Sequence, residues 1–118
     1  FCQMFLNGGN YGGKRIMGGK TIDLMNSNQL EKMGLDPSLF LGNNGNSFGL
    51  GFALVTRKST SHAHTSEGTF SWGGIFNTKY WIDPKEEMFM VAMAQIYPFT
   101  SSDIWPKLDA IIYSSVED

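Results

Sequence analysis

The chain has 118 residues, a formal net charge of −2 and a sequence pI near 5.6, which is enough length for one domain with a buried core. Its basic residues are scattered, so nothing predicts binding to nucleic acid, and its apolar runs are too short to span a membrane. Cys2 is the only cysteine, which excludes an intrachain disulfide; among apolar neighbours it is expected to be a buried structural thiol.

The first half of the chain is predicted to be helical and loop-rich. Residues 1–6 form a helical pattern that ends at an Asn-Gly-Gly signal but begins without a capping residue, which is typical of a piece of a longer protein. No leader peptide pattern is visible, and for such a piece this leaves the compartment open. Residues 10–15 have the composition of a turn, and residues 21–27 predict a short helix. Residues 29–47 predict a long surface loop, or surface excursion.

The second half predicts an antiparallel sheet of about four strands with flanking helices, an α+β fold. A strand is expected over residues 48–56, and two more on either side of residues 72–75. A turn at residues 83–86, with Pro at its second position, leads to a last strand over residues 88–96. Because this strand is apolar on both faces, it is expected to be central in the sheet. A terminal helix to Ser115 should lay an apolar stripe of Ile104, Leu108, Ile111 and Ile112 on the sheet.

The stretch around Trp72, Gly73 and Gly74 is the most informative part of the chain. Paired glycines inside a strand pattern mark a bulge, or a place where another backbone or a ligand approaches closely. A large flat side chain beside two residues without side chains also leaves backbone N–H groups accessible. A structural bulge and a binding site are both compatible with this pattern.

Three other motifs are weaker candidates for chemistry. Ser47 lies in a G-x-S-x-G pattern, but a strand follows it where a nucleophile elbow needs a helix, and no acidic residue lies between it and His62. His62 and His64 have only Glu67 as a nearby third ligand, so solvated loop histidines are expected and no metal site is predicted. Asp83 and the pair of glutamates at 86–87 are expected to form a solvated turn.

Aromatic residues are abundant, with 9 Phe, 4 Tyr and 3 Trp. An exposed row of them on the sheet would suit a non-catalytic, glycine- and aromatic-rich binding module for carbohydrate. Packing in the core is the competing interpretation, because each aromatic side chain buries a large apolar area.

Several segments, in this order and spacing, resemble the C-terminal part of the β-lactamase-related serine hydrolases, which include class C β-lactamase-like proteins, β-lactamase-fold esterases and D-alanyl-D-alanine peptidase-like proteins. The segments that carry the resemblance are residues 48–52, 70–74, 80–84 and 93–95, preceded by residues 1–9, 13–16 and 20–25. The resemblance covers nearly the whole chain, so residues 1–118 are expected to be a single partial domain, the C-terminal portion of a β-lactamase/transpeptidase-like fold.

The resemblance implies roles for four residues. Trp72, Gly73 and Gly74 match the third active-site motif, which lines one wall of the substrate cleft. The backbone N–H of Ile75 is implied to be one of two oxyanion-hole donors, and a donor of this kind is worth about 3 kcal/mol in a working site. Trp72 replaces the lysine of many members, which favours esterase or peptidase-like chemistry over strong β-lactamase activity.

Departures from the family pattern define what the chain lacks. No serine is followed three positions later by lysine, and no second motif beginning with Tyr is present; Asn77 stands where many relatives have glycine, and residues 18–19 replace a Ser-Pro helix start. The nucleophile and its activating lysine and tyrosine are therefore expected upstream. The implied partners are the N-terminal half of the parent hydrolase and a small ester, β-lactam or peptide substrate, with no cofactor. The chain alone is expected to be inactive.

Overall fold

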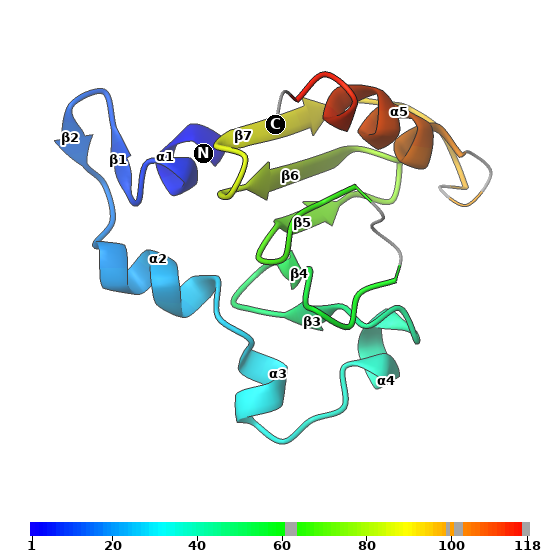
Figure 1. The fold of residues 1–118 in the computed structure, drawn as a ribbon, viewed down its shortest axis with the longest axis horizontal. Coiled ribbons are helices and arrows are strands. Elements are labelled where there is room, and N and C mark those ends of the chain that lie inside the picture. Colours follow the sequence, from blue (N-terminus) through cyan, green and yellow to red (C-terminus); the bar gives the residue numbers. More distant parts are fainter. Residues whose placement is uncertain (61–63, 99, 101–102, 117–118) are drawn as a thin grey trace.

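A five-stranded antiparallel sheet is the centre of this computed structural model, which describes residues 1–60, 64–98, 100 and 103–116. Its strand order follows the chain, from β3 at one edge to β7 at the other (Figure 1). The strands are β3 (Ser47–Phe48), β4 (Ala53–Leu54), β5 (Phe70–Gly73), β6 (Lys79–Asp83) and β7 (Met88–Ala92). A two-stranded hairpin of β1 (Asn10–Tyr11) and β2 (Lys14–Arg15) lies apart from it. The expected α+β class is confirmed.

In the part of the chain that the structure describes, five α-helices precede or follow the sheet. They are α1 (Cys2–Leu6), α2 (Gly19–Met25), α3 (Gln29–Lys32), α4 (Ser38–Leu41) and α5 (Ile104–Tyr113). The predicted surface excursion over residues 29–47 thus contains two single-turn helices. The first of them has a clear cause, because the Asn28 side chain accepts a hydrogen bond from the Glu31 N–H at 3.0 Å.

The strand predicted over residues 48–56 is wrong, since it is two short strands joined by a turn. The Gly49 N–H donates to the Phe52 carbonyl at 2.8 Å, and Gly51 has a φ of +96°. A Cβ at Gly49 would lie 2.2 Å from the Met25 carbonyl oxygen, so only glycine fits where the loop after α2 passes this turn. The split explains why the sheet has five strands where four were expected.

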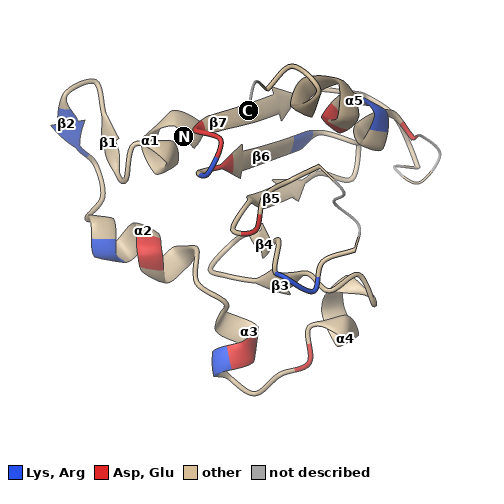
Figure 2. Cartoon of the chain, viewed as in Figure 1, with Lys and Arg blue, Asp and Glu red and all other residues tan. Residues whose placement is uncertain are grey.

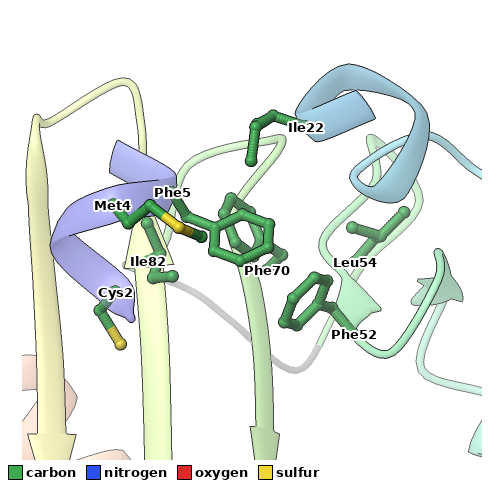
Figure 3. Close-up of a cluster of buried hydrophobic side chains, with 8 residues drawn as sticks. All are labelled: Cys2, Met4, Phe5, Ile22, Phe52, Leu54, Phe70 and Ile82. Carbon is green, nitrogen blue, oxygen red and sulfur yellow. The ribbon is translucent and has the colours of Figure 1, made fainter. Parts of the chain in front are cut away.

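One face of the sheet packs against α1. Cross-strand pairing places Phe70 of β5 opposite Ile82 of β6, and both are buried beneath Phe5 of α1 (Figure 3). The core cluster on this face consists of Cys2, Met4, Phe5, Ile22, Phe52, Leu54, Phe70 and Ile82. Cys2 is the buried thiol that its neighbours predicted, and burial raises its pKa.

β7 lies at the edge of the sheet, which contradicts the prediction that it would be central. It pairs with β6 alone, and in the part of the chain that the structure describes no strand covers its other edge. Phe89 and Val91 are 38% and 55% exposed, and Met93 just beyond the strand is 83% exposed. An apolar strand with no charged or proline residue therefore presents an open edge.

The opposite face of the sheet packs against α5, through polar groups where an apolar stripe was expected. Of the predicted stripe, Ile111 is 68% exposed and Ile104 is 40% exposed, whereas Leu108 and Ile112 are half-buried, so only half of the stripe is on the side that faces the sheet. The contacts instead come from Trp105, Asp109 and Tyr113, spaced four residues apart on one helix face. We call these three residues the α5 seam. Its partners are Asn77, Lys79, Trp81 and Asp83.

Asp83 is fully buried at the end of the seam, although a solvated turn was predicted. One carboxylate oxygen accepts the Tyr113 hydroxyl at 2.7 Å and the Ser66 N–H at 3.2 Å, while the other accepts the N–H groups of Lys85 and Glu86. Burial alone would raise the pKa of Asp83, but these hydrogen bonds outweigh it and the pKa is lowered. Burial and the bond to Asp83 raise the pKa of Tyr113.

This environment predicts a pH dependence of stability. Because the folded pKa of Asp83 lies below its ordinary value of 3.8, its contribution is complete at neutral pH and is lost as pH falls below that value, through the folded pKa. Asp83→Asn should lower the free energy of unfolding at pH 7 by about 2 kcal/mol and flatten its decline in acid. Urea unfolding of both proteins between pH 7 and pH 3 measures this. Parallel pH profiles would contradict the assignment.

Charges of both signs are interspersed over the elements, and the described residues show no basic stripe (Figure 2). None of the helices in these residues is long and apolar enough to cross a bilayer.

Candidate active-site wall at the β5–β6 hairpin

The hairpin that joins β5 to β6 carries the predicted site. β5 ends at Gly73, β6 begins at Lys79, and residues 74–78 form the loop. The Gly74 N–H donates to the Thr78 carbonyl at 3.0 Å, and the Asn77 N–H donates to the Gly74 carbonyl at 2.9 Å. Asn77 completes the turn with a φ of +71°, a conformation that asparagine tolerates better than most residues. The loop therefore has a defined internal structure.

Gly73 is required by a close backbone approach within this hairpin, and Gly74 approaches a side chain. A Cβ at Gly73 would lie 2.8 Å from the Thr78 carbonyl oxygen, and one at Gly74 would lie 2.5 Å from the Thr78 hydroxyl oxygen. The first contact is the more costly, because a carbonyl in the turn moves less easily than a hydroxyl group. The paired glycines thus have a structural role, and the interpretation of this hairpin as a binding site needs separate support.

That support comes from the backbone N–H of Ile75. Among the residues that the structure describes, this N–H has no hydrogen-bond partner, and neither has that of Phe76, whereas the N–H groups of Gly74 and Asn77 are both bonded. The Ile75 side chain is 61% exposed. The result is an accessible donor held by an ordered turn, which is the arrangement that an anion-binding backbone requires.

Trp72, three residues before this donor in the chain, lies on the α1 face of the sheet. It pairs across strands with Tyr80, and its ring meets Phe48 edge-on at 5.1 Å. The Trp72 side chain is 47% exposed, so it offers an aromatic wall while its edge is fixed. Burial, with a smaller contribution from nearby Cys2, raises the pKa of Tyr80, whose ring also meets Phe1.

The cation nearest to Trp72 in sequence, among the described residues, points the other way. Lys79 pairs with Gly73 across the strands and so lies on the α5 face, where its Nζ is 2.7 Å from Asp109. Lys79 therefore contributes no charge to the face of the sheet that carries Trp72.

The other candidates carry no site. Ser47 is 1% exposed, begins a strand, and donates its hydroxyl hydrogen bond to Asn28, so the nucleophile elbow is absent as expected. His62 lies outside the described residues, and Glu67 is bonded to Arg57 at 3.1 Å. Within the described ranges no group of three or more possible ligands could hold a metal ion.

Exposed aromatics do not form a row on the described sheet strands. On the five-stranded sheet the exposed ones are Trp72 on β5 and Phe89 on β7, and α1 lies over the β6 positions between them. A sugar-stacking platform would need neighbouring exposed rings. The alternative of a carbohydrate-binding module therefore gains no support from the sheet.

Sequence reasoning missed the α5 seam, which reaches this hairpin. Trp105 donates its indole N–H to the Asn77 side chain, and Asp109 accepts both Lys79 and the Trp81 indole N–H, at 2.7 and 2.8 Å. The sequence signal was the four-residue spacing of side chains with hydrogen-bonding groups at 105, 109 and 113. A search for apolar periodicity alone does not detect it.

The fold defines a class: the chain has the fold of the C-terminal portion of β-lactamase-fold proteins. Simvastatin synthase (LovD) from Aspergillus terreus matches 96% of this chain with a TM-score of 0.67 and 21% identity, over 32% of LovD. EstCE1, a hydrolase with promiscuous acyltransferase activity, matches 95% with a TM-score of 0.68 and 20% identity, over 27% of its length. A proposed beta-lactamase from Bacteroides dorei matches 96% with a TM-score of 0.61 and 17% identity, over 38% of its length.

Among curated proteins, Protein Rv1367c of Mycobacterium tuberculosis is 30% identical over 109 residues, which is 87% of this chain. The chain spans 27% of the length of that relative. No protein-family model matches the chain. The predicted fold relationship is confirmed, and the comparisons align this chain with only a part of each of these proteins.

Proposed function

We propose that the chain is the C-terminal part of a β-lactamase-fold serine hydrolase and supplies one wall of its active site. The observation that carries the proposal is the unbonded N–H of Ile75, an exposed residue in the hairpin loop that directly follows Trp72, Gly73 and Gly74. In this proposal Ile75 donates to the oxyanion, and Trp72, Gly73 and Gly74 line the cleft. The fold match to EstCE1, a hydrolase by its description, supports the reaction class.

The proposed reaction proceeds through an acyl-enzyme. A serine outside these residues, activated by a lysine and a tyrosine that also lie outside them, attacks the carbonyl carbon of an ester or amide. The carbonyl oxygen gains the negative charge, and the Ile75 N–H stabilises it by a hydrogen bond. The leaving alcohol or amine departs with a proton, and water then hydrolyses the acyl-serine.

The apolar wall indicates the substrate. Trp72 and Phe48 form an aromatic edge, and Lys79 is turned to the other face and paired with Asp109. An acyl group without a carboxylate suits this wall, because no cation beside Trp72 would offset the cost of desolvating a charge. Uncharged esters are therefore the proposed substrates, ahead of carboxylate-bearing β-lactams.

The open edge of β7 supports a missing structural partner. Its apolar sequence is typical of a central strand, and an uncovered edge with exposed Phe89, Val91 and Met93 is rare in an independent domain. On the outer side of α5, Ile111 is also 68% exposed. We propose that the N-terminal half of the parent hydrolase covers both surfaces.

The test compares the 118-residue chain with a protein that also carries the upstream sequence. The chain alone should not turn over p-nitrophenyl esters or nitrocefin. The longer protein should hydrolyse p-nitrophenyl esters much faster than nitrocefin, and replacing the serine of its Ser-x-x-Lys motif by alanine should abolish the activity. Serine-dependent turnover by the 118 residues alone would overturn the proposal that the nucleophile lies upstream. An inactive longer protein would overturn the hydrolase assignment.

A further inference from the structure

The α5 seam ends at the loop that presents the Ile75 N–H. Each seam residue bonds to a different position along β6 or the loop before it. Tyr113 bonds at the far end of β6, Asp109 in its middle, and Trp105 at the loop. Because helix residues four apart share one face, a single rigid element contacts the strand and the loop together. The seam thus fixes the hairpin loop relative to the sheet.

Asn77 is where the helix and the loop meet. Its side-chain oxygen accepts the Trp105 indole N–H. Its backbone N–H donates to the Gly74 carbonyl at 2.9 Å, which closes the turn that contains Ile75. Asn77 is 3% exposed and has a φ of +71°. Loss of the indole donor would leave a buried amide oxygen without that partner in a residue whose backbone conformation is already unusual.

A second contact holds the loop tip at Phe76, next to Asn77. The Ile96 N–H donates to the Phe76 carbonyl at 3.1 Å, and the Tyr97 ring lies 6.0 Å from the Phe76 ring. The two residues that follow Ile75 are therefore both anchored, Phe76 from the segment after β7 and Asn77 from α5. The unbonded N–H of Ile75 directly precedes these anchors.

We propose that Trp105 is a positioning residue for the reaction: through Asn77 it sets the direction of the Ile75 N–H. This inference rests on the proposed function, since a direction matters only if the N–H meets an oxyanion. A donor must lie within about 0.5 Å of its productive position, so a loosened loop weakens transition-state stabilisation more than substrate binding. The inference therefore predicts that loss of Trp105 lowers kcat and leaves KM nearly unchanged.

The experiment uses the protein that carries the upstream nucleophile and the variant Trp105→Phe, which keeps a ring but removes the indole donor. The kcat for p-nitrophenyl butyrate should fall about tenfold, the effect of one hydrogen bond, while KM stays within about twofold. Lys107→Ala is the matched control on the same helix. Its side chain is exposed and its bond to Asp103 is a surface pair, so its kcat should be unchanged.

Hydrogen exchange of the peptide that contains residues 74–78 gives a readout that does not depend on activity. Trp105→Phe should accelerate exchange at the Asn77 N–H, while amides of β6 at Trp81 and Ile82 keep wild-type rates. A wild-type kcat in Trp105→Phe, or unchanged exchange in the loop, would overturn the inference. If the wild-type protein proves inactive, the proposed function fails, and the exchange result alone then decides whether Trp105 holds the loop.

Discussion

Asp109→Ala should destabilise the chain by about 3–5 kcal/mol, the largest effect expected of any change in the seam. Asp109 is 7% exposed and accepts from both the Lys79 ammonium at 2.7 Å and the Trp81 indole at 2.8 Å. Its removal leaves a mostly buried cation and a buried N–H without an acceptor. Urea unfolding at pH 7, followed by tryptophan fluorescence, gives the free energy of unfolding.

Two further variants separate the charge from the hydrogen bonds. Asp109→Asn keeps one acceptor but loses the negative charge, so its cost should be smaller than that of alanine. Adding Lys79→Met to Asp109→Asn removes the stranded cation and should recover more than half of the loss, because replacing a buried ion pair by less polar groups is often nearly neutral. A cost below about 1 kcal/mol for Asp109→Ala would show that the seam does not hold α5 to the sheet.

The seam also explains where sequence reasoning succeeded and where it failed on the second half of the chain. The helix over residues 104–113 was predicted from its spacing, but its buried face was not. Apolar counting chose Leu108 and Ile112, which are half-buried, but also Ile104 and Ile111, which are exposed. It gives no weight to a carboxylate that meets a lysine and an indole across the sheet. Such a partner is set by tertiary packing and cannot be read from one helix.

Other failures have local physical causes. The strand expected over residues 48–56 is broken because Gly49 must pass the Met25 carbonyl, a contact between segments far apart in sequence. The apolar pattern of β7 predicted a central strand, and the open edge instead raises the question of what covers it. The hairpin with Trp72, Gly73 and Gly74 was predicted, since turn chemistry and alternation are local, whereas its anchor at Trp105 was not.

Ile75→Pro should reduce kcat of the parent hydrolase by about 10²–10³-fold, the usual effect of removing one oxyanion-hole donor. Proline removes the backbone N–H, and in the described chain this N–H bonds to no other protein group. It also replaces the side chain and fixes φ, so a variant that keeps the N–H is needed as a control. The residue before it is Gly74, which can adopt the extended backbone that a following proline favours.

This variant should therefore lose activity while its stability stays close to that of the wild type. Its free energy of unfolding should change by less than about 1 kcal/mol, because no internal hydrogen bond is lost and the side chain is 61% exposed. Ile75→Val keeps the N–H and a branched side chain, and should retain wild-type kcat. Equal losses in both variants would place the role of Ile75 in its side chain, whereas a folded, fully active Ile75→Pro protein would remove this N–H from the oxyanion hole. A loss confined to proline means that the hairpin contributes to catalysis through its backbone, which is why its shape has to be held by Asn77 and the helix behind it.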